Sequence, residues 1–456
     1  MPAKALLRAL PSVDEFLREP EGQALLAKHP RALVLSALRR TLEGMRKEIL
    51  SGKAPAFAGR VAAAVEEAAR PGLRRAVNAT GVLLHTGLGR APLADSAGTA
   101  VAEALRACTL EIDSDTGERG TRDASVSRLL CELTGAESAL VVNNNAAATL
   151  ILLNTLAASR EVVVSRGELV EIGGAYRMPE VMEAAGVRMR EVGTTNKTHL
   201  RDYEKAIRKE TGLLIKVHTS NYRVVGFHEE VSLSDLVALG RKRKVPVAHD
   251  LGSGALFPLS PFGLEDEPQV ASSLKAGALA VCFSADKLLG GPQAGILVGK
   301  RKAIDAMRRN PLARALRVGK MTLAALEATL RLHQDPERRA KELPLWRMLS
   351  APLPELQGRA EGLSKRLAAA GPGVEAAVKP SRAQVGSGSV PAQEMESRAV
   401  VLSVAKVPAG DLARRLRAFS VPVFSRVQGG RVWLDVRTLM PGDEERVEAA
   451  LRSALA

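Results

Sequence analysis

The first part of the chain carries apolar side chains at helical spacing. Apolar residues recur every three or four positions through VDEFLREPEGQALLAKHP, RALVLSALRRTLEGMRKEIL and GRVAAAVEEAAR, which is the period of an α-helix with one buried face. Glycine and proline interrupt this pattern at Ser51-Gly52 and Pro71-Gly72, where helices are expected to end. The pattern predicts a small helical domain over residues 1–70.

The middle of the chain changes to short apolar runs that alternate with helical stretches such as AAATLILLNTLA and SLSDLVALGRKRK. This βαβα alternation predicts a mostly parallel sheet with helices on both faces. The last two runs are close enough to form a hairpin, which adds one antiparallel strand. The predicted strands are SALVVN (138–143), EVVVS (161–165), VRMREVG (187–193), GLLIKV (212–217), VPVAHD (245–250), LAVCFS (279–284) and AGILVG (294–299).

After residue 300 the pattern predicts long helices and then a smaller α/β domain. AIDAMRRN and MTLAALEATLRLH have helical spacing, and AVVLSVAK and RVWLDVRTL alternate with the helical GDLARRLRAF. We expect this domain to be joined through the Gly/Ser-rich stretch QVGSGSVP. The expected domains are therefore residues 1–70, 71–330 and 331–456.

Charge leaves the class of partner open. Lys and Arg outnumber Asp and Glu by 65 to 50, which gives a formal net charge of +15. Such an excess favours contact with a polyanion such as nucleic acid. A generally Arg-rich composition explains the same number equally well.

Cysteines and apolar runs bear on the compartment. Cys108, Cys131 and Cys282 are widely spaced and form no CxxC motif, which argues against a disulfide framework and a structural zinc site. The chain begins without the sustained apolar stretch of a signal peptide, and it contains no uninterrupted apolar run of about 18 residues. We expect a cytoplasmic protein with no membrane segment and no metal site.

Chemistry-bearing residues follow three of the predicted strands, at the sheet edge where ligands of open α/β sheets collect. Asn143, Asn144 and Asn145 open a helix and offer amides and backbone N–H groups to an anion such as a phosphate, although ordinary helix capping explains them as well. Asp250 ends an apolar strand, where a carboxylate needs a cationic partner. That partner is a protonated pyridinium nitrogen, a salt-bridged side chain or a metal.

Lys287 follows the third of these strands and precedes a glycine-rich turn, in the string ADKLLGGPQAG. A lysine that is partly desolvated there has a lowered pKa, and its neutral amine can form an imine. An isolated loop lysine is usually solvated. Its place after the asparagines and Asp250 on successive strand ends nevertheless predicts a pyridoxal 5'-phosphate (PLP) Schiff base on Lys287.

This order of residues is that of the large domain of fold-type I PLP enzymes, and longer strings resemble the bacterial selenocysteine synthase family. The strings are NATGVLLHTGLGRAPL, LTGAESALVVNNNAAATLILLNTLA, KVHTSNYRVVGF, DLGSGAL, FSADKLLGGPQAGILVGK and NPLARALRVGKMTLAALEATL. The resemblance covers nearly the whole chain. It implies a seven-stranded, mostly parallel α/β large domain, a small C-terminal α/β domain and an N-terminal helical domain that binds tRNA.

The resemblance also implies the activity and the assembly. The family converts L-seryl-tRNA(Sec) into L-selenocysteinyl-tRNA(Sec), with selenophosphate as selenium donor and a PLP-bound dehydroalanyl-tRNA as intermediate. It forms a ring-shaped homodecamer.

The cofactor site follows from the same motifs. Lys287 would carry the Schiff base and Asp250 would face the pyridinium nitrogen. Asn144 and Asn145 would form part of the phosphate cradle. Two further residues, Ser220 and Asn221 in HTSN, would lie near the ring.

The catalytic and donor-binding residues are likewise implied by the family. The Lys287 amine would remove the Cα proton, and its ammonium, assisted by Asp286, would protonate the leaving hydroxide. Arg90, Arg314 and Arg317 would bind selenophosphate, since guanidinium groups suit a phosphate-like dianion. The spacing of three predicts that Arg314 and Arg317 share one face of a helix.

Two positions depart from the family pattern, and two other functions are compatible with the fold. Gly319 stands where Asp is expected and Ser125 where His is expected, which affects the detail of substrate or subunit contacts. One alternative is a PLP lyase or aminotransferase acting on a free amino acid. The other is a catalytically silent tRNA-binding protein, against which Asp250 and Lys287 argue.

Overall fold

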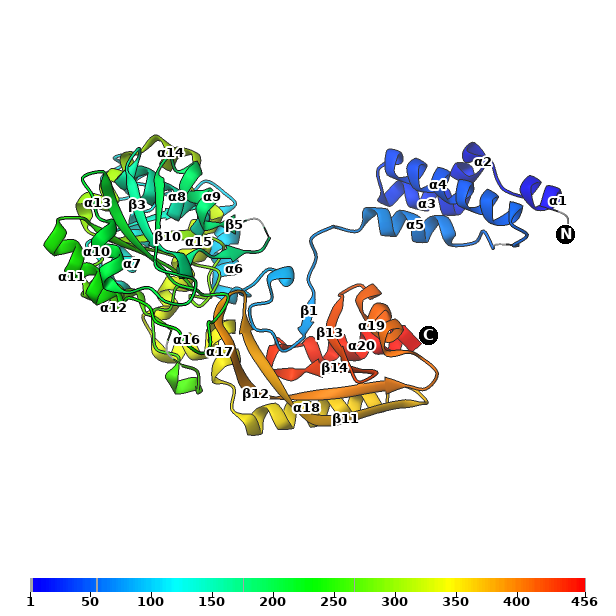
Figure 1. Ribbon diagram of the computed structural model, residues 1–456. Helices are drawn as coiled ribbons and strands as arrows, with labels where there is room; N and C mark the ends of the chain where they lie inside the picture. Colours follow the sequence, from blue (N-terminus) through cyan, green and yellow to red (C-terminus); the bar gives the residue numbers. More distant parts are fainter. Residues whose placement is uncertain (1–2, 55, 175, 266, 456) are drawn as a thin grey trace. The chain divides into compact units, whose positions relative to one another are not determined.

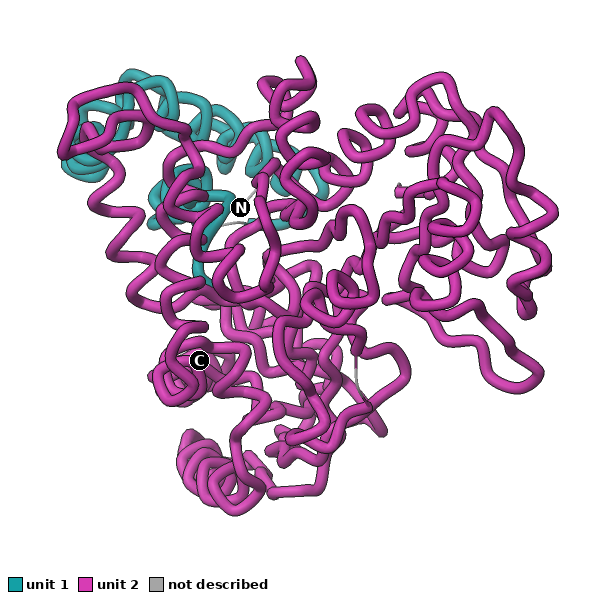
Figure 2. Tube along the Cα trace, turned by 90° about the vertical axis from the view of Figure 1, so that its left-hand side faces the viewer, with its two compact units in different colours: residues 1–75 teal, residues 76–456 magenta. Residues whose placement is uncertain are grey.

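The computed structural model describes residues 3–54, 56–174, 176–265 and 267–455. Contacts divide the chain into two compact units, residues 1–75 and residues 76–456 (Figure 2). Each unit is described by itself. In the described part of the chain, no helix combines the length and the apolar character needed to cross a bilayer.

The first unit consists of helices packed around one apolar core, as predicted. Helix α2 begins with a capping box in which Ser12 and Glu15 satisfy each other's backbone N–H groups. Phe16 from α2 is fully buried and packs edge-on against Phe57 at 5.6 Å between ring centroids. The helices are α1 (Ala3–Arg8), α2 (Val13–Arg18), α3 (Pro20–Lys28), α4 (Arg31–Leu50) and α5 (Arg60–Ala69).

A seven-stranded sheet forms the centre of the second unit (Figure 1). Its order is β2-β10-β9-β8-β7-β3-β6, and β10 runs antiparallel to both of its neighbours while the other pairs are parallel. All seven predicted strands and the predicted antiparallel hairpin are confirmed. The strands are β2 (Ser138–Val142), β3 (Glu161–Ser165), β6 (Arg188–Val192), β7 (Thr211–Val217), β8 (Val247–Gly252), β9 (Ala280–Ser284) and β10 (Gly295–Gly299).

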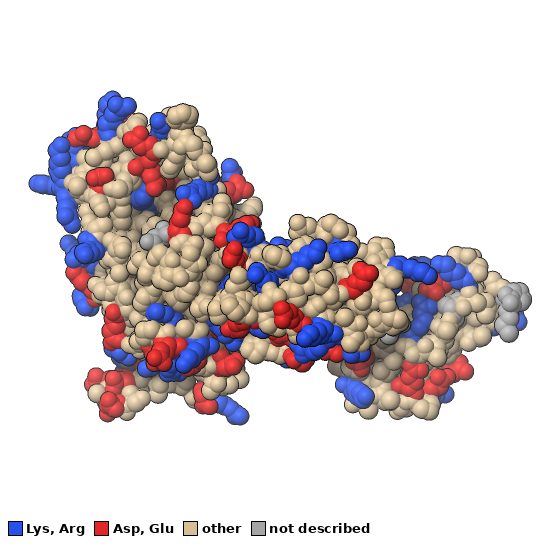
Figure 3. All heavy atoms as spheres, turned by 90° about the horizontal axis from the view of Figure 1, so that it is seen from below, with Lys and Arg blue, Asp and Glu red and all other residues tan. Residues whose placement is uncertain are grey.

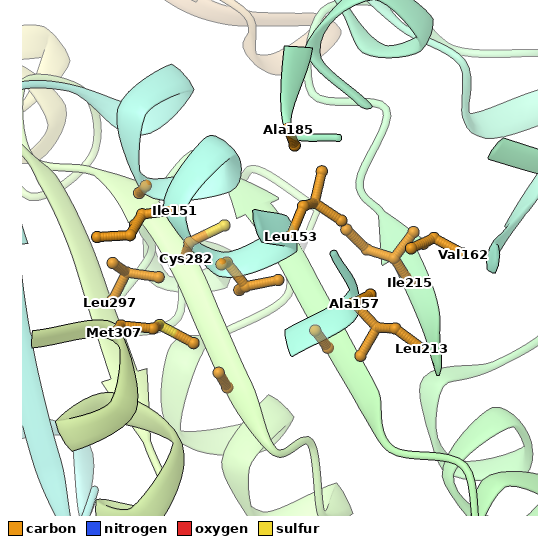
Figure 4. Packing of buried hydrophobic residues seen from close by; sticks show 14 of the residues in the cluster. Ile151, Leu153, Ala157, Val162, Ala185, Leu213, Ile215, Cys282, Leu297 and Met307 are labelled. Atoms are coloured by element: carbon orange, nitrogen blue, oxygen red, sulfur yellow. The ribbon is translucent and has the colours of Figure 1, made fainter. Parts of the chain in front are cut away.

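Helices cover both faces of this sheet, so its central strands are buried throughout and read as continuous apolar runs. On one face Ile151 of α8 packs near Leu297 of β10 and Cys282 of β9, and Leu153 and Ala157 pack over residues of β3 and β7 such as Val162 and Ile215 (Figure 4). The helices of this part are α6 (Asp95–Ala104), α7 (Ala124–Thr134), α8 (Asn145–Ala157), α9 (Met178–Ala184), α10 (Leu200–Ala206), α11 (Leu233–Arg243), α12 (Val270–Ala276), α13 (Arg301–Arg309), α14 (Pro311–Ala315), α15 (Lys320–His333), α16 (Pro336–Glu342) and α17 (Pro344–Ser350). A short hairpin, β4 (Glu171–Ile172) and β5 (Tyr176–Arg177), follows β3.

The C-terminal part forms a five-stranded sheet of order β1-β13-β14-β12-β11, with its own apolar core. Its first strand precedes the large sheet in the chain and pairs in parallel with β13, as Val77 opposite Val423. The strands are β1 (Val77–Ala79), β11 (Val374–Gly386), β12 (Ser389–Val404), β13 (Val423–Gln428) and β14 (Arg431–Asp435), and the helices are α18 (Leu353–Ala368), α19 (Ala409–Ala418) and α20 (Asp443–Leu455).

The Gly/Ser-rich stretch QVGSGSVP is not the domain linker that the sequence predicted. It forms the tip of the long β11–β12 hairpin, which reaches from the small sheet to the large domain (Figure 1). Gly386 and Gly388 have positive φ values of 82° and 66°, which glycine adopts without strain. Val385 and Val390 bury this tip in an apolar cluster with Leu288 of the large domain. The composition therefore marked a turn that packs against the large domain.

Candidate active site

Lys287 lies in the turn between β9 and β10, at the carboxyl end of the large sheet. Lys287 is 5% exposed. The turn is closed by a hydrogen bond from the Gly290 backbone N–H to the Lys287 carbonyl oxygen, 2.8 Å. Burial lowers the pKa of the Lys287 amine, and the nearby Arg90 cation lowers it further, against the opposing charges of Asp250 and Asp286. The neutral amine that an imine requires is therefore favoured here.

Asp250 lies in β8, the neighbour of β9, and is 4% exposed. Both of its oxygens accept hydrogen bonds from the start of α8: Oδ1 from Asn145 Nδ2 (2.8 Å) and Oδ2 from Thr149 Oγ1 (2.9 Å). Burial raises the pKa of this carboxyl group, and these two donors and the Lys287 charge oppose the rise. A nearby cation would stabilise such a desolvated carboxylate.

The amino end of α8 lies beside this pair. Asn144 is its N-cap, and its Oδ1 accepts a hydrogen bond from the Ala147 backbone N–H at 2.9 Å. A Cβ built on Gly295 of β10 would overlap the Asn144 carbonyl oxygen, so only glycine allows β10 to approach this closely. The first backbone N–H groups of α8 form a general anion-binding position. Within the protein, Asn144 therefore caps α8, and Asn145 donates a hydrogen bond to Asp250.

Ser220 and Asn221 follow β7, the next strand in the sheet. Ser220 is buried, and its Oγ has no hydrogen-bond partner among the described residues. Asn221 is exposed and donates its Nδ2 to the Glu171 carbonyl oxygen, 2.7 Å. A Cβ built on Gly388 at the hairpin tip would lie 3.1 Å from Asn221 Cβ and 3.7 Å from Lys287 Nζ. The hairpin tip therefore borders the space in front of the lysine.

Arg90 forms an ion pair with Asp286, the residue before Lys287. Arg90 Nη1 lies 2.8 Å from Asp286 Oδ2, and Ser284 Oγ donates to the other oxygen at 2.8 Å. Arg90 itself has a positive φ of 63°. Each oxygen of Asp286 thus accepts one hydrogen bond, and Arg90 is held beside the lysine.

Arg314 and Arg317 do not share a helix face, contrary to the sequence prediction. Helix α14 ends at Ala315, because the Leu316 carbonyl oxygen accepts a hydrogen bond from the Asn143 backbone N–H (2.8 Å) and Arg317 forms a β-bridge with Val142. Both arginines still line one hollow of about 270 Å³, together with Glu111, Arg119, Arg122, Asp123 and Arg308. Neither Arg90 nor Lys287 lines this hollow.

Other polar residues of the site escaped the sequence prediction. Thr149 lies one helical turn after Asn145, a spacing that signals a shared face. The hydroxyl of Tyr176 is buried without a hydrogen-bond partner among the described residues, and burial, followed by the charge of Asp250, raises its pKa well above the usual value. His218 directly follows β7, so the rule that ligands collect at the carboxyl ends of parallel strands would have selected it. Glu267 lies in a loop and carries no such signal.

A larger hollow of about 800 Å³ lies at the ends of β3 and β7, and Lys287 is not among the residues that line it. His218 and Glu267 line it where it approaches the strand ends, and Pro391 to Gln393 of the hairpin line it from the small domain. The remaining walls come mainly from the loops at 194–198 and 222–230. Its size is that of pockets that hold small molecules or parts of larger ligands.

The described residues fit PLP as a ligand. A desolvated lysine is available for an imine, a buried carboxylate for a pyridinium N–H, and the amino end of α8 for a phosphate. Ser220 Oγ and Asn145 Oδ1 are buried polar atoms without partners among the described residues, and such atoms usually bond a ligand or water.

The chain matches known families over most of its length. Residues 76–440 match the family model described as L-seryl-tRNA selenium transferase, and residues 7–46 match the one described as selenocysteine synthase N terminal. The chain is 50% identical to the L-seryl-tRNA(Sec) selenium transferase of Desulfomicrobium baculatum, over 99% of each chain. It is 48% identical to the L-seryl-tRNA(Sec) selenium transferase of Geobacter sulfurreducens, over 97% of this chain and 98% of that one.

Among solved structures, that of D-glucosaminate-6-phosphate ammonia-lyase has a similar fold. The TM-score is 0.59 at 21% identity, and the alignment covers 84% of this chain and 96% of that chain. Identity at this level shows a shared fold. Together with the seven-stranded sheet and the helical N-terminal unit, it confirms the predicted fold class.

Proposed function

The chain belongs to the L-seryl-tRNA selenium transferase family, and we propose that it converts L-seryl-tRNA(Sec) into L-selenocysteinyl-tRNA(Sec) with PLP as cofactor and selenophosphate as selenium donor. The observation that carries the proposal is the placement of Lys287 and Asp250, both buried, at neighbouring strand ends within the matched segment. A tRNA substrate also implies a cytoplasmic enzyme.

We assign the cofactor to the residues at these strand ends. Lys287 would hold PLP covalently through Nζ, and Asp250 would accept the pyridinium N–H, kept in place by Asn145 and Thr149. The amino end of α8, capped by Asn144, would receive the phosphate. Ser220 and Asn221 would border the ring. When bound, PLP withdraws electrons from the substrate amino acid and acidifies its Cα–H bond.

Lys287 would also act as the base of the reaction. Once its amine is free, the lowered pKa increases the share of the neutral form, which can accept the Cα proton of the seryl group. Asp286 would support this step indirectly, since its carboxylate fixes Arg90 next to the lysine. The seryl carboxyl group is esterified to tRNA, so no arginine is needed to bind a free carboxylate.

Three arginines would bind the selenophosphate dianion. Arg90 lies beside Lys287, where the selenium must be delivered. Arg314 and Arg317 line a separate hollow in the single chain. The proposal therefore requires a second copy of the chain to bring the two sets together, which agrees with the homodecamer implied by the family resemblance.

The tRNA body would bind the helical unit at residues 1–75. Residues 7–46 of this unit match the selenocysteine synthase N-terminal model. The net charge of +15 favours a polyanionic partner. On the face drawn in Figure 3, basic side chains are interspersed with acidic ones. The support for the proposal is therefore the net charge of the whole chain.

The test is a conversion assay with purified protein, PLP, seryl-tRNA(Sec) and selenophosphate. Wild type should form selenocysteinyl-tRNA, and Lys287→Ala should form none, because it lacks both the covalent anchor and the base. Lys300→Ala is the matched control, since Lys300 is an exposed lysine after β10 that pairs with Glu137, and it should retain wild-type turnover. Wild-type protein that processes only a free amino acid would contradict the proposed substrate, and protein that binds no PLP would contradict the cofactor as well.

A further inference from the structure

A buried carboxylate near the lysine has no part in the cofactor site assigned above. The side chain of Glu267 is 4% exposed. Its Oε2 accepts a hydrogen bond from Ser253 Oγ at 2.8 Å, and its Oε1 accepts one from the Val390 backbone N–H of the hairpin tip, also at 2.8 Å. These donors hold the carboxylate in one orientation in a place where an unpaired charge is costly.

His218 faces this carboxylate. Its Nδ1 lies 3.6 Å from Glu267 Oε2 and is buried with no hydrogen-bond partner in the described part of the chain. The side chain as a whole is 21% exposed and lines the 800 Å³ hollow. An imidazole with one nitrogen turned to a fixed carboxylate and the rest of its ring open to a ligand-sized hollow is the usual arrangement of a general acid or base.

Short connections link this pair to the strand ends that carry Lys287 and Asp250. The residue after Lys287 donates its backbone N–H to the Ser253 carbonyl oxygen (3.1 Å), and the Ser253 hydroxyl bonds Glu267. The His218 backbone N–H donates to the Asp250 carbonyl oxygen at 2.9 Å. The Glu267 charge also acts on the Lys287 amine, whose pKa it raises against the stronger effects of burial and Arg90.

The proposed reaction needs an acid, because hydroxide is a poor leaving group. Asp286 is held in the ion pair with Arg90, and Ser284 donates to its other oxygen. We propose that His218, oriented by Glu267, donates the proton to the departing hydroxyl of the seryl group. This inference rests on the function proposed above.

The step balances as an elimination of water. Lys287 Nζ takes the Cα proton, and the electron pair of the Cα–H bond forms the double bond between Cα and Cβ. The Cβ–Oγ bond breaks with its electron pair on oxygen, and the His218 imidazolium gives its proton to that oxygen. Water leaves, neutral imidazole remains, and solvent in the hollow protonates the ring again. Glu267, with its Oε2 3.6 Å from His218 Nδ1, orients the ring and is a positioning residue.

The test compares two leaving groups in wild type and His218→Gln, with PLP bound in both. The substrates are seryl-tRNA(Sec) and 3-chloroalanyl-tRNA(Sec), since chloride leaves without a proton. His218→Gln should lose about 100-fold or more in elimination from the seryl substrate and stay within about threefold of wild type with the chloro substrate. Glu267→Gln should show the same split with a smaller loss.

The matched control is His199→Gln. His199 also has its Nδ1 beside a glutamate, 2.9 Å from Glu229 Oε1, but it does not line the hollow, and its variant should behave as wild type with both substrates. An equal loss of His218→Gln on both substrates would overturn the inference by showing a structural role, and no loss would overturn it by assigning the acid elsewhere. Wild type that eliminates from neither substrate overturns the proposed function and this inference together.

A second measurement uses a variant that cannot eliminate. Diethyl pyrocarbonate modifies accessible imidazoles, and mass spectrometry locates the modified residue. In Lys287→Ala protein, which lacks the base and leaves the seryl group intact, saturating seryl-tRNA(Sec) should slow the modification of His218 at least about threefold more than deacylated tRNA(Sec) does, because only the acylated form fills the hydroxyl position. Equal protection by the two tRNAs would contradict contact with the seryl group.

Discussion

Two buried aspartates, one in each sheet of the second unit, are treated differently by their surroundings. Asp435 ends β14 of the small sheet and accepts four hydrogen bonds, from the Arg437 backbone N–H and the side chains of Ser381, Ser397 and Arg426. Asp250 in the large sheet accepts two, both from α8. A carboxylate has room for about four donors, so Asp435 is satisfied by the protein and Asp250 retains capacity for a ligand.

The same contrast extends to the neighbours of each aspartate. A Cβ built on Gly81 would lie 2.8 Å from Asp435 Oδ2, so the chain closes tightly over that carboxylate. Around Asp250, the hydroxyl of Tyr176 and the oxygen of Asn145 are buried without partners in the described residues. A filled polar network stabilises the fold, and a partly filled one next to a desolvated lysine marks a binding site.

The largest expected effect is that of Asp250→Asn. The amide cannot balance a pyridinium charge, so turnover of seryl-tRNA should fall about 1000-fold, in the range lost with a positioned charged catalytic group. Thr149 can accept a hydrogen bond from the new amide, because its hydroxyl already has a second acceptor in the Asn145 carbonyl oxygen at 3.0 Å. The free energy of unfolding of the apoprotein, measured in urea, should therefore stay within about 1 kcal/mol of wild type. Strong destabilisation would show that Asp250 is structural like Asp435.

Asp435→Asn should have the opposite result. Each oxygen of Asp435 accepts two hydrogen bonds, so an amide nitrogen in place of either oxygen would face two donors and leave buried groups unpaired. This should lower the free energy of unfolding by about 3 kcal/mol. PLP binding per folded molecule should be unchanged, as measured by absorbance after removal of unfolded protein. Asp411→Asn, in an exposed pair with Arg414, is the control and should change stability by less than about 0.5 kcal/mol. Loss of PLP binding by folded Asp435→Asn protein would contradict the conclusion that Asp435 stabilises the fold and Asp250 serves a ligand.

For the large sheet, much of this contrast could be predicted from the sequence. The strands are continuous apolar runs because both faces are covered, and parallel strand ends meet at one edge, so Asp250 and Lys287 could be placed together. Their remaining partners depend on long-range folding. Glu267 lies in a loop and receives a backbone N–H from a hairpin tip more than a hundred residues away.

Two local patterns misled for the same reason. The Gly/Ser-rich stretch at 384–391 has the composition of a linker, and its burial against Leu288 is decided by the length of the hairpin that carries it. Arg314 and Arg317 have helical spacing, but pairing of the following segment with the end of β2 stops the helix. Composition and spacing report local preference, and tertiary hydrogen bonds override it.

Acid should destabilise the large domain first, because every histidine of the chain precedes residue 334. Burial lowers the pKa of His249 from 6.5 to about 3. Between these values the unfolded chain binds the proton and the folded chain does not, so stability falls as pH falls below 6.5. His249→Gln should remove about 2 kcal/mol of the loss in unfolding free energy between pH 7 and pH 5. An unchanged pH dependence would contradict the buried, neutral imidazole.

The smallest expected effect concerns Arg90. Its charge lowers the pKa of Lys287, and Asp286 raises it. Arg90→Gln removes the charge that lowers this pKa, and it leaves Asp286, which raises the pKa, without its ion-pair partner. Both changes raise the pKa of Lys287. The rate at which the apoprotein takes up PLP should therefore reach its half-maximum at a higher pH than in wild type. Arg452→Gln, in the exposed pair with Glu448, should show no shift, and neither should Arg90→Gln if the two side chains are uncoupled.

Reductive trapping identifies the lysine that binds PLP. Wild-type protein loaded with PLP is reduced with borohydride, digested and analysed by mass spectrometry, which fixes the cofactor to the residue that held it. The pyridoxyl group is expected on Lys287 at a stoichiometry near one per chain, and none is expected on the exposed Lys300. Label on another lysine, or no label on Lys287, would contradict the assignment of this buried lysine, together with Asp250, as the cofactor site.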